Sequence, residues 1–368
     1  IQPRQELEKL SDYVPGKSID EICERHGLSS AIKLASNENP WGASPKAKAA
    51  FLKQVDSLHL YPRGDAPTLI KQLAEHYQVD SKQIILGNGS DEVIDLIGKA
   101  FIAPGDLCVS ATPTFSVYEF TTLEAGGIFK AFPVGVGKAN MQELAKVTAS
   151  ARVLFLCNPN NPTGVYYSES EILELLRLLP KNVLLFLDEA YAEFAVATDY
   201  PNLVSRIHEF PNLFINRTFS KIYGLAGLRL GYGISSIEVI RNLWKVKPPF
   251  DVNLAAQAAG IAALQDKEFV QMTREKNREG MLVLKKAFEE TLKDINVSNE
   301  LKSKTLNNIY SKNNVYHLPY IIRNCAAIFV VTCICLSVYI INNDIFSEKD
   351  MAHDTALDSS ISQTQESD

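Results

Sequence analysis

A regular alternation of short apolar runs with longer amphipathic stretches, between residues 44 and 235, constrains the fold more than any other feature. Short runs of Val, Ile, Leu and Phe are typical of strands buried on both faces, and apolar residues at helical spacing are typical of covering helices. The predicted strands are residues 84–86, 107–109, 153–157, 183–187, 213–215 and 228–234. The predicted helices are residues 67–77, 91–101, 168–179 and 237–245. This rhythm predicts an α/β domain with a mainly parallel sheet between helices.

The two ends of the chain differ from its centre, because long amphipathic patterns replace the alternation there. These patterns cover residues 2–27, 254–264 and 267–292. We therefore expect a smaller α+β domain built from both chain ends. The predicted division is an arm and part of the small domain in 1–40, a large domain in 41–250, the helical part of the small domain in 251–295, and an atypical segment in 296–368.

The atypical segment contains two unusual stretches. Residues 326–341 form an apolar run without a formal charge, and residues 347–368 are polar and acidic, which is typical of a disordered tail. The apolar run is slightly shorter than the roughly 17–25 residues that span a bilayer. Two interpretations stay open: a buried β-rich segment or non-native ending, and a C-terminal membrane anchor.

Charge and composition argue against several classes of function. The formal net charge is −6, from 37 Lys and Arg residues against 43 Asp and Glu residues, so the chain lacks the basic footprint of a nucleic-acid-binding protein. The six Cys and six His residues show neither a disulfide framework nor metal-ligand spacing, so we expect no metal. No charged and apolar leader opens the chain, which favours a cytoplasmic location over secretion.

Lys221 lies among small residues in the segment 218–229, just past a predicted strand. A lysine in such a place is poorly hydrated, and a desolvated amine has a lowered pKa and becomes a nucleophile for Schiff-base chemistry. The alternative is a solvated loop lysine without a chemical role.

Asp188 follows another predicted strand, at the edge where open α/β sheets place their ligand crevice. A carboxylate buried there needs a cationic or hydrogen-bond-donating partner, and a pyridinium nitrogen would be such a partner. The alternative is that Asp188 caps the following helix, with Glu189 exposed to solvent.

Asn161 lies in the segment 158–164, where two prolines and a glycine fix a rigid turn after a predicted strand. Such a turn is able to present the Asn161 amide to a phenolate oxygen on a ring that lies over the sheet. The alternative is an ordinary turn whose Asn side chains satisfy backbone groups.

Ser90 and Asp91 lie in the segment 87–92, where glycines between a predicted strand and helix let backbone N–H groups reach an anion such as phosphate. Neither the dinucleotide fingerprint nor the P-loop fits, because Glu92 replaces the third glycine and no Gly-Lys-Ser/Thr follows. The alternative is that Ser90 is an ordinary helix N-cap.

An anion-binding turn, a rigid Asn turn, a strand-end Asp and the pair Ser220-Lys221 are together the parts that a pyridoxal phosphate site needs. The chain resembles the fold-type I pyridoxal-phosphate aminotransferases, and among them most closely the histidinol-phosphate aminotransferases, over roughly residues 2–295. The matching segments are residues 13–17, 34–40, 61–62, 161–164, 188–191, 220–221 and 249–253.

The resemblance implies a role for each matching residue. Lys221 would bind pyridoxal 5'-phosphate covalently and move a proton between the substrate's α-carbon and the cofactor, and Asp188 would keep the ring nitrogen protonated. Tyr191 and Asn161 would bond the ring's phenolic oxygen. The other implied contacts are Ser90, Asp91, Ser220 and Arg229 with the phosphate, Phe115 stacked on the ring, Tyr61 with the phosphate of the partner subunit, and Tyr13 and Asn37 with substrate.

The resemblance also implies amino-group exchange between L-histidinol phosphate and 2-oxoglutarate, with glutamate as the second amino compound, in histidine biosynthesis by a homodimer with shared sites. The alternatives are an aminotransferase for aromatic amino acids, a related decarboxylase, or a non-catalytic membrane-attached derivative. One family feature has no match, an arginine of the small domain that binds the substrate's carboxylate or phosphate. After Arg278 the sequence has a single arginine, Arg323, and the surrounding pattern differs from the family's.

Overall fold

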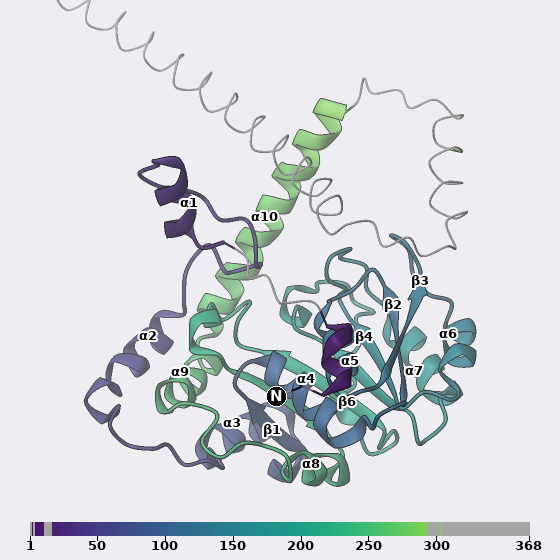
Figure 1. Cartoon of the computed structure of the whole chain (residues 1–368). Helices are drawn as coiled ribbons and strands as arrows, with labels where there is room; N and C mark the ends of the chain where they lie inside the picture. The colour runs from purple at the N-terminus through teal and green to yellow at the C-terminus, as the bar shows by residue number, and fades with distance from the viewer. Residues whose placement is uncertain (1, 3, 11–16, 293–302, 304–368) are drawn as a thin grey trace, which may run out of the picture. The chain divides into compact units, whose positions relative to one another are not determined.

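Figure 1 shows the computed structural model of the chain, which describes residues 2, 4–10, 17–292 and 303. Contacts divide the chain into two units, Ile1–Lys286 and Ala287–Asp368. Of the second unit, the structure describes only the end of one helix and residue 303. The apolar run 326–341, the acidic stretch 347–368 and Arg323 therefore lie outside the described residues.

The described part of the first unit contains one sheet of seven strands, in the order β1-β7-β6-β5-β4-β2-β3. β7 is antiparallel to both of its neighbours, and the other neighbouring strands are parallel. The prediction of an α/β fold with a mainly parallel sheet is confirmed. The strands are β1 (Ile84–Gly87), β2 (Leu107–Thr112), β3 (Ile128–Pro133), β4 (Val153–Cys157), β5 (Leu184–Asp188), β6 (Leu213–Thr218) and β7 (Gly231–Ser235).

Helices cover both faces of this sheet (Figure 1). Buried side chains of α4, α5 and α8 pack on one face, and those of α3, α6, α7 and α9 pack on the other. No helix in the described ranges has both the length and the apolar character needed to cross a membrane. The helices are α1 (Ile19–His26), α2 (Pro45–Leu52), α3 (Pro67–Tyr77), α4 (Ser90–Phe101), α5 (Val117–Glu124), α6 (Met141–Thr148), α7 (Glu169–Leu178), α8 (Ile237–Leu243), α9 (Leu254–Leu264) and α10 (Lys267–Leu292).

Most predicted elements are present with limits that differ by a few residues, and α3, α9 and α10 have the predicted limits. The predicted strand 228–234 is wrong at its start, because Ala226–Leu228 form a 3-10 turn and β7 begins at Gly231. In the N-terminal region, predicted to be helical, the structure has α1 and a 3-10 turn at Gln5–Lys9. The elements that the sequence did not indicate are α2, α5, α6 and β3. The predicted domain limits stay a prediction.

The register of the central strands aligns Cys157 of β4, Asp188 of β5 and Asn216 of β6. These residues lie at or near the carboxyl ends of three parallel strands, which meet at one edge of the sheet. Side chains alternate between the two faces of a strand. Asp188 therefore continues the face of Phe186, and Glu189 turns toward the opposite face.

Candidate active site

A cavity of about 680 Å³ lies at this carboxyl edge of the sheet. Its volume is within the range of pockets that bind cofactors and other small molecules. All of the predicted site residues except Tyr61 and Tyr13 line it. The lining residues are Ser36, Asn37, Glu38, Ser90, Asp91, Phe115, Cys157, Asn161, Asp188, Ala190, Tyr191, Thr218, Ser220, Lys221, Ala226, Gly227 and Arg229.

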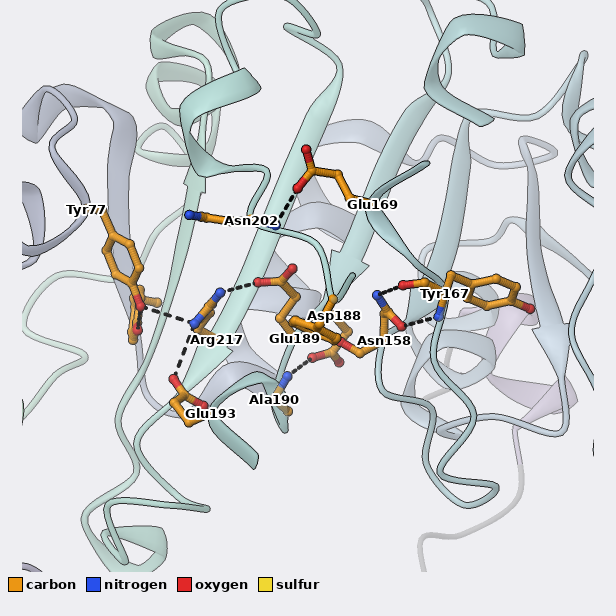
Figure 2. A network of polar contacts seen from close by, with 12 residues as sticks. Tyr77, Asn158, Tyr167, Glu169, Asp188, Glu189, Ala190, Glu193, Asn202 and Arg217 are labelled. Atoms are coloured by element: carbon orange, nitrogen blue, oxygen red, sulfur yellow. Dashed lines mark hydrogen bonds and ion pairs between the residues drawn. The ribbon is translucent and has the colours of Figure 1, made fainter. Parts of the chain in front are cut away.

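Asp188 is the buried carboxylate of the cavity. Tyr118 donates its hydroxyl to Asp188 Oδ2 at 2.7 Å, and the Ala190 amide donates to Oδ1 at 3.1 Å (Figure 2 draws the second bond). Burial raises the pKa of Asp188 to about 6, although these donors favour the charged form. Asp188 thus has neutral donors but no ion pair to a described residue, and its charge would be stabilised by a cationic ligand group.

Lys221 lies in the turn that follows β6 and is half-buried. Its Nζ donates to the Ser36 carbonyl oxygen at 2.9 Å and lies 5.6 Å from the centre of the Tyr191 ring. Burial lowers the pKa of Lys221, and the charges of Asp91 and Glu38 oppose the shift. The amine therefore loses its proton more readily than an exposed lysine does, which agrees with the nucleophilic interpretation rather than with a solvated loop lysine.

Tyr191 and Asn161 lie in two different turns that border the same cavity. Asn37 Nδ2 donates to the Tyr191 hydroxyl oxygen at 2.9 Å, which leaves the hydroxyl proton free to be donated. The neighbours of Asn161 behave as in an ordinary turn, since their side chains bind backbone groups. Asn158 bonds the Tyr167 backbone in both directions, and Asn160 donates to the Pro113 carbonyl oxygen.

The amino end of α4 borders the cavity, which Ser90 and Asp91 line. Its N-cap is Gly89, with φ +86°, so the interpretation of Ser90 as the N-cap is wrong. Arg229 Nη2 lies 3.0 Å from Asp91 Oδ2 at this helix end. A Cβ at Gly89 would lie 2.3 Å from the Arg229 guanidinium, and a Cβ at Gly231 would lie 2.3 Å from the Ser90 nitrogen. Glycine at both positions thus leaves room for the Arg229 guanidinium and the Ser90 backbone to lie close together at this helix end.

Two predicted site residues do not line the cavity. Tyr61 is 84% exposed, and its ring packs on Phe250 with 5.0 Å between ring centres. Tyr13 lies outside the described residues. Among the described residues, no three His, Cys, Asp or Glu side chains form a group that could hold a metal ion.

The sequence reasoning missed Tyr118, Thr218 and Cys157, and it misjudged Glu189. The Tyr118 ring lies edge-on to that of Phe115, with 5.7 Å between ring centres, but Phe115 precedes α5, so no helical spacing marked Tyr118 in the sequence. The Thr218 hydroxyl accepts a hydrogen bond from the Ser220 amide at 3.1 Å. Cys157 is a buried thiol that pairs with Asp188 in the strand register. The suggestion that Glu189 is exposed is wrong, because Glu189 is 1% exposed and pairs with Arg217.

The comparison with family models agrees with this fold and site. The model described as "Aminotransferase class I and II" matches residues 29–341. The fold and the cavity thus define an enzyme of the aminotransferase class, and the chain belongs to the class I and II aminotransferase family.

Within this family, similar proteins with known names point to a narrower group, the histidinol-phosphate aminotransferases. The histidinol-phosphate aminotransferase of Geobacillus sp. (strain WCH70) is 44% identical over 282 residues, which are 76% of this chain and 77% of that protein. The histidinol-phosphate aminotransferase of Brevibacillus brevis is 45% identical over 79% of this chain and 80% of that protein.

Solved structures of similar proteins include two with different activities in their names. The histidinol-phosphate aminotransferase from Sinorhizobium meliloti, in complex with pyridoxal-5'-phosphate, has a TM-score of 0.69 and 26% identity, over 74% of this chain and 73% of that one. The L-threonine-O-3-phosphate decarboxylase from Porphyromonas gingivalis has a TM-score of 0.60 and 26% identity, over 68% and 77%.

Proposed function

We propose that this protein uses pyridoxal 5'-phosphate to exchange an amino group between L-histidinol phosphate and 2-oxoglutarate, in histidine biosynthesis. The observation that carries the proposal is that one cavity holds both Lys221, an amine with a lowered pKa, and Asp188, a buried carboxylate that forms no ion pair with a described residue. The identity of about 44% to histidinol-phosphate aminotransferases supports the choice of substrate.

The described residues fit each polar group of the cofactor. The cradle left open by Gly89 and Gly231 suits the phosphate, with Arg229, Ser220 and the amides of Ser90 and Asp91 as donors. Asp188 suits the ring nitrogen, Tyr191 and Asn161 suit the phenolic oxygen, and Lys221 suits the aldehyde. When bound, the cofactor supplies an electron-withdrawing ring that stabilises negative charge at the substrate's α-carbon.

The residues of the chain then hold groups and move a proton. Lys221, with its lowered pKa, is able to take a proton from the substrate's α-carbon and return it at a neighbouring atom. The carboxylate of Asp188 keeps a proton on its ligand partner, and Tyr118 holds that carboxylate in place. Tyr191, which accepts a hydrogen bond from Asn37, would donate its own proton to a ligand in the cavity.

The same proposal includes the remaining site residues and the assembly. Tyr61, exposed and outside the cavity of its own chain, would reach the phosphate of a partner subunit, so that a homodimer shares its sites. Asn37 and Tyr13 would contact substrate. A cytoplasmic location belongs to this proposal. Residues 41–250 would then be the cofactor-binding domain, with 1–40 and 251–295 contributing to the smaller one.

The first test is spectroscopic. We expect the purified full chain with added pyridoxal phosphate to show the visible absorbance band of the covalently bound cofactor, and Lys221→Ala to abolish it. Lys138→Ala is the matched control, since Lys138 is not among the residues that line the cavity and pairs with Glu171 at 2.8 Å. A wild-type protein that stays colourless after incubation with excess cofactor and removal of the unbound cofactor would refute the proposal.

The second test concerns the substrate, because one similar structure is a decarboxylase of a phosphorylated amino acid. We expect amino transfer from histidinol phosphate to 2-oxoglutarate to exceed transfer from phenylalanine. Release of carbon dioxide from threonine phosphate at a higher rate would instead favour the decarboxylase. Recovery of an inactive chain in the membrane pellet, lost on deletion of residues 326–341, would favour the membrane-attached derivative.

A further inference from the structure

Glu189, Glu193 and Arg217 form a buried ionic cluster at the turn that carries Tyr191. Glu189 and Glu193, two residues before and after Tyr191, are 1% and 12% exposed, and both pair with Arg217 (Figure 2). Arg217 Nη2 lies 2.5 Å from Glu189 Oε2, and Nη1 lies 3.4 Å from Glu193 Oε1. A single guanidinium thus holds the turn on both sides of Tyr191.

Four other elements fix this cluster in place. The guanidinium of Arg217, on β6, lies 5.4 Å from the centre of the Tyr77 ring on α3. The Tyr77 hydroxyl is hydrogen-bonded to that of Tyr232 on β7 at 2.7 Å. Arg274 Nε of α10 donates to the Glu193 carbonyl oxygen at 2.8 Å. The rigid sheet and two helices therefore determine where the turn lies.

Holding this turn with buried charges costs free energy, because burial disfavours the charged form of each side chain. Burial raises the pKa of Glu189 and of Glu193, and Arg217 opposes both shifts, so the two carboxylates share one cation, with Arg274 a second cation near Glu193. Glu189 Oε1 has no hydrogen-bond partner among the described residues. The neighbouring Asn turn is held by neutral bonds between Asn158 and Tyr167 instead. A buried ion pair rarely adds stability over neutral packing, but its fixed geometry is able to specify position.

We propose that Arg217 is a positioning residue for Tyr191, which it directs at the cofactor's phenolic oxygen by holding Glu189 and Glu193 together. This inference rests on the proposed function. The hydroxyl of Tyr191 must point into the cavity, and the polar contacts of its side chain among the described residues are the hydrogen bond from Asn37 and the Lys221 amine near its ring.

A displaced Tyr191 has a measurable consequence. A hydroxyl that donates to the phenolic oxygen draws electron density from it, so the oxygen attracts the neighbouring proton less strongly. Loss of that bond therefore raises the pH midpoint of the absorbance band. The charged or titratable groups that face Tyr191 and Lys221 are Cys157, Asp188, Asp91, Glu38 and Arg229, and none of them is altered by the variants below.

The experiment is a pH titration of the visible band of the full chain loaded with pyridoxal phosphate. The test protein carries Arg217→Met, Glu189→Gln and Glu193→Gln together, because removing all three charges leaves no unpaired buried ion. We expect its midpoint to lie about one pH unit above that of the wild type, as for the loss of one hydrogen bond to a charged oxygen. An unchanged midpoint would overturn the proposal.

Two further variants sharpen the result. Arg217→Lys keeps the charge but not the geometry by which one guanidinium binds both carboxylates, so we expect the midpoint to shift upward. This variant replaces the triple variant as the test if the triple variant does not fold. Leu144→Ala, in the buried core of α6, should lower the melting temperature without moving the midpoint. An equal shift in Leu144→Ala would overturn the proposal, because lost stability alone would then explain it.

The decisive control is Tyr191→Phe. In that background the triple substitution should produce no further shift, because Tyr191 is the residue through which the cluster acts. Additive shifts would contradict the proposal. The failure of this inference is distinct from failure of the proposed function, since the wild-type band itself tests the latter.

Discussion

Two consecutive acidic residues at the end of β5 have opposite surroundings. Asp188 faces the cavity, where it accepts hydrogen bonds from the neutral donors Tyr118 and Ala190. Glu189 faces the other side of the sheet, where Arg217 lies 2.5 Å away. Both side chains are almost completely buried, and burial raises the pKa of each.

The different partners of Asp188 and Glu189 show that a fold can compensate one buried charge internally and leave another without an ion pair. The charge of Glu189 is compensated inside the protein, so this carboxylate serves the structure. The charge of Asp188 is solvated by hydroxyl and amide groups but paired with no described cation, so a cationic ligand group gains a strong partner there. Three predictions test this division of roles, and each replaces one of the two acids or its immediate support.

The largest expected effect is on the rate of amino transfer. Asp188→Asn should lower kcat by about 10²–10³-fold, the usual cost of losing one electrostatic group at a reacting centre, with the cofactor band retained. Glu189→Gln should lower kcat less than about tenfold, because its partner is structural. Steady-state rates with saturating cofactor check both values, and a greater loss in Glu189→Gln would contradict the comparison.

The second effect is on stability without cofactor. The folded chain holds the Asp188 proton up to about pH 6, against a value of 3.8 for the free side chain, so it binds more protons in this window. Stability therefore falls as the pH rises between these values, by up to about 3 kcal/mol in total. The free energy of unfolding of Asp188→Asn should therefore exceed that of the wild type by this amount above about pH 6 and should equal it near pH 4.

Urea unfolding of the cofactor-free proteins at several pH values measures this difference. An advantage of Asp188→Asn that does not change with pH would show that the carboxylate carries no such penalty. Glu189→Gln sharpens the comparison, since it leaves Arg217 without its closest partner and should lower stability.

The smallest effect concerns the support of Asp188. Tyr118→Phe removes a donor that favours the charged carboxylate, so the pKa of Asp188 should rise further. We expect about a tenfold loss of rate and an acid limb of the pH–rate profile that moves up by about one pH unit. Tyr167→Phe is the matched control, because it removes a buried hydroxyl that accepts a hydrogen bond from the Ala139 amide outside the cavity, and an equal change in its profile would count against the interpretation.

Elements buried on both faces were predicted well from the sequence. The strands that became β4 and β5 are continuous apolar runs, and periodicity alone identifies them. β3 was missed because it lies at the edge of the sheet with most of its side chains exposed. The direction of β7 was beyond sequence analysis, because antiparallel pairing with β1 and β6 depends on how the chain returns to the sheet.

The candidate site was predicted where local motifs mark it. Lys221, Asn161 and Asp188 follow apolar strands, and parallel strands bring their carboxyl ends together, so sequence order was enough to infer one cavity. Tyr118 and Arg217 were missed because their roles depend on contacts with residues 70 and 28 positions away in the chain.

The sequence by itself determined the class of fold and the chemistry available at one edge of the sheet, because apolar periodicity and strand-end residues are local properties. Only the tertiary structure decided that Glu189, the acid adjacent to Asp188, is buried against an arginine rather than exposed to solvent. The physical reason is that the free energy of a buried charge depends on the groups within a few ångströms of it, and those groups come from distant parts of the chain.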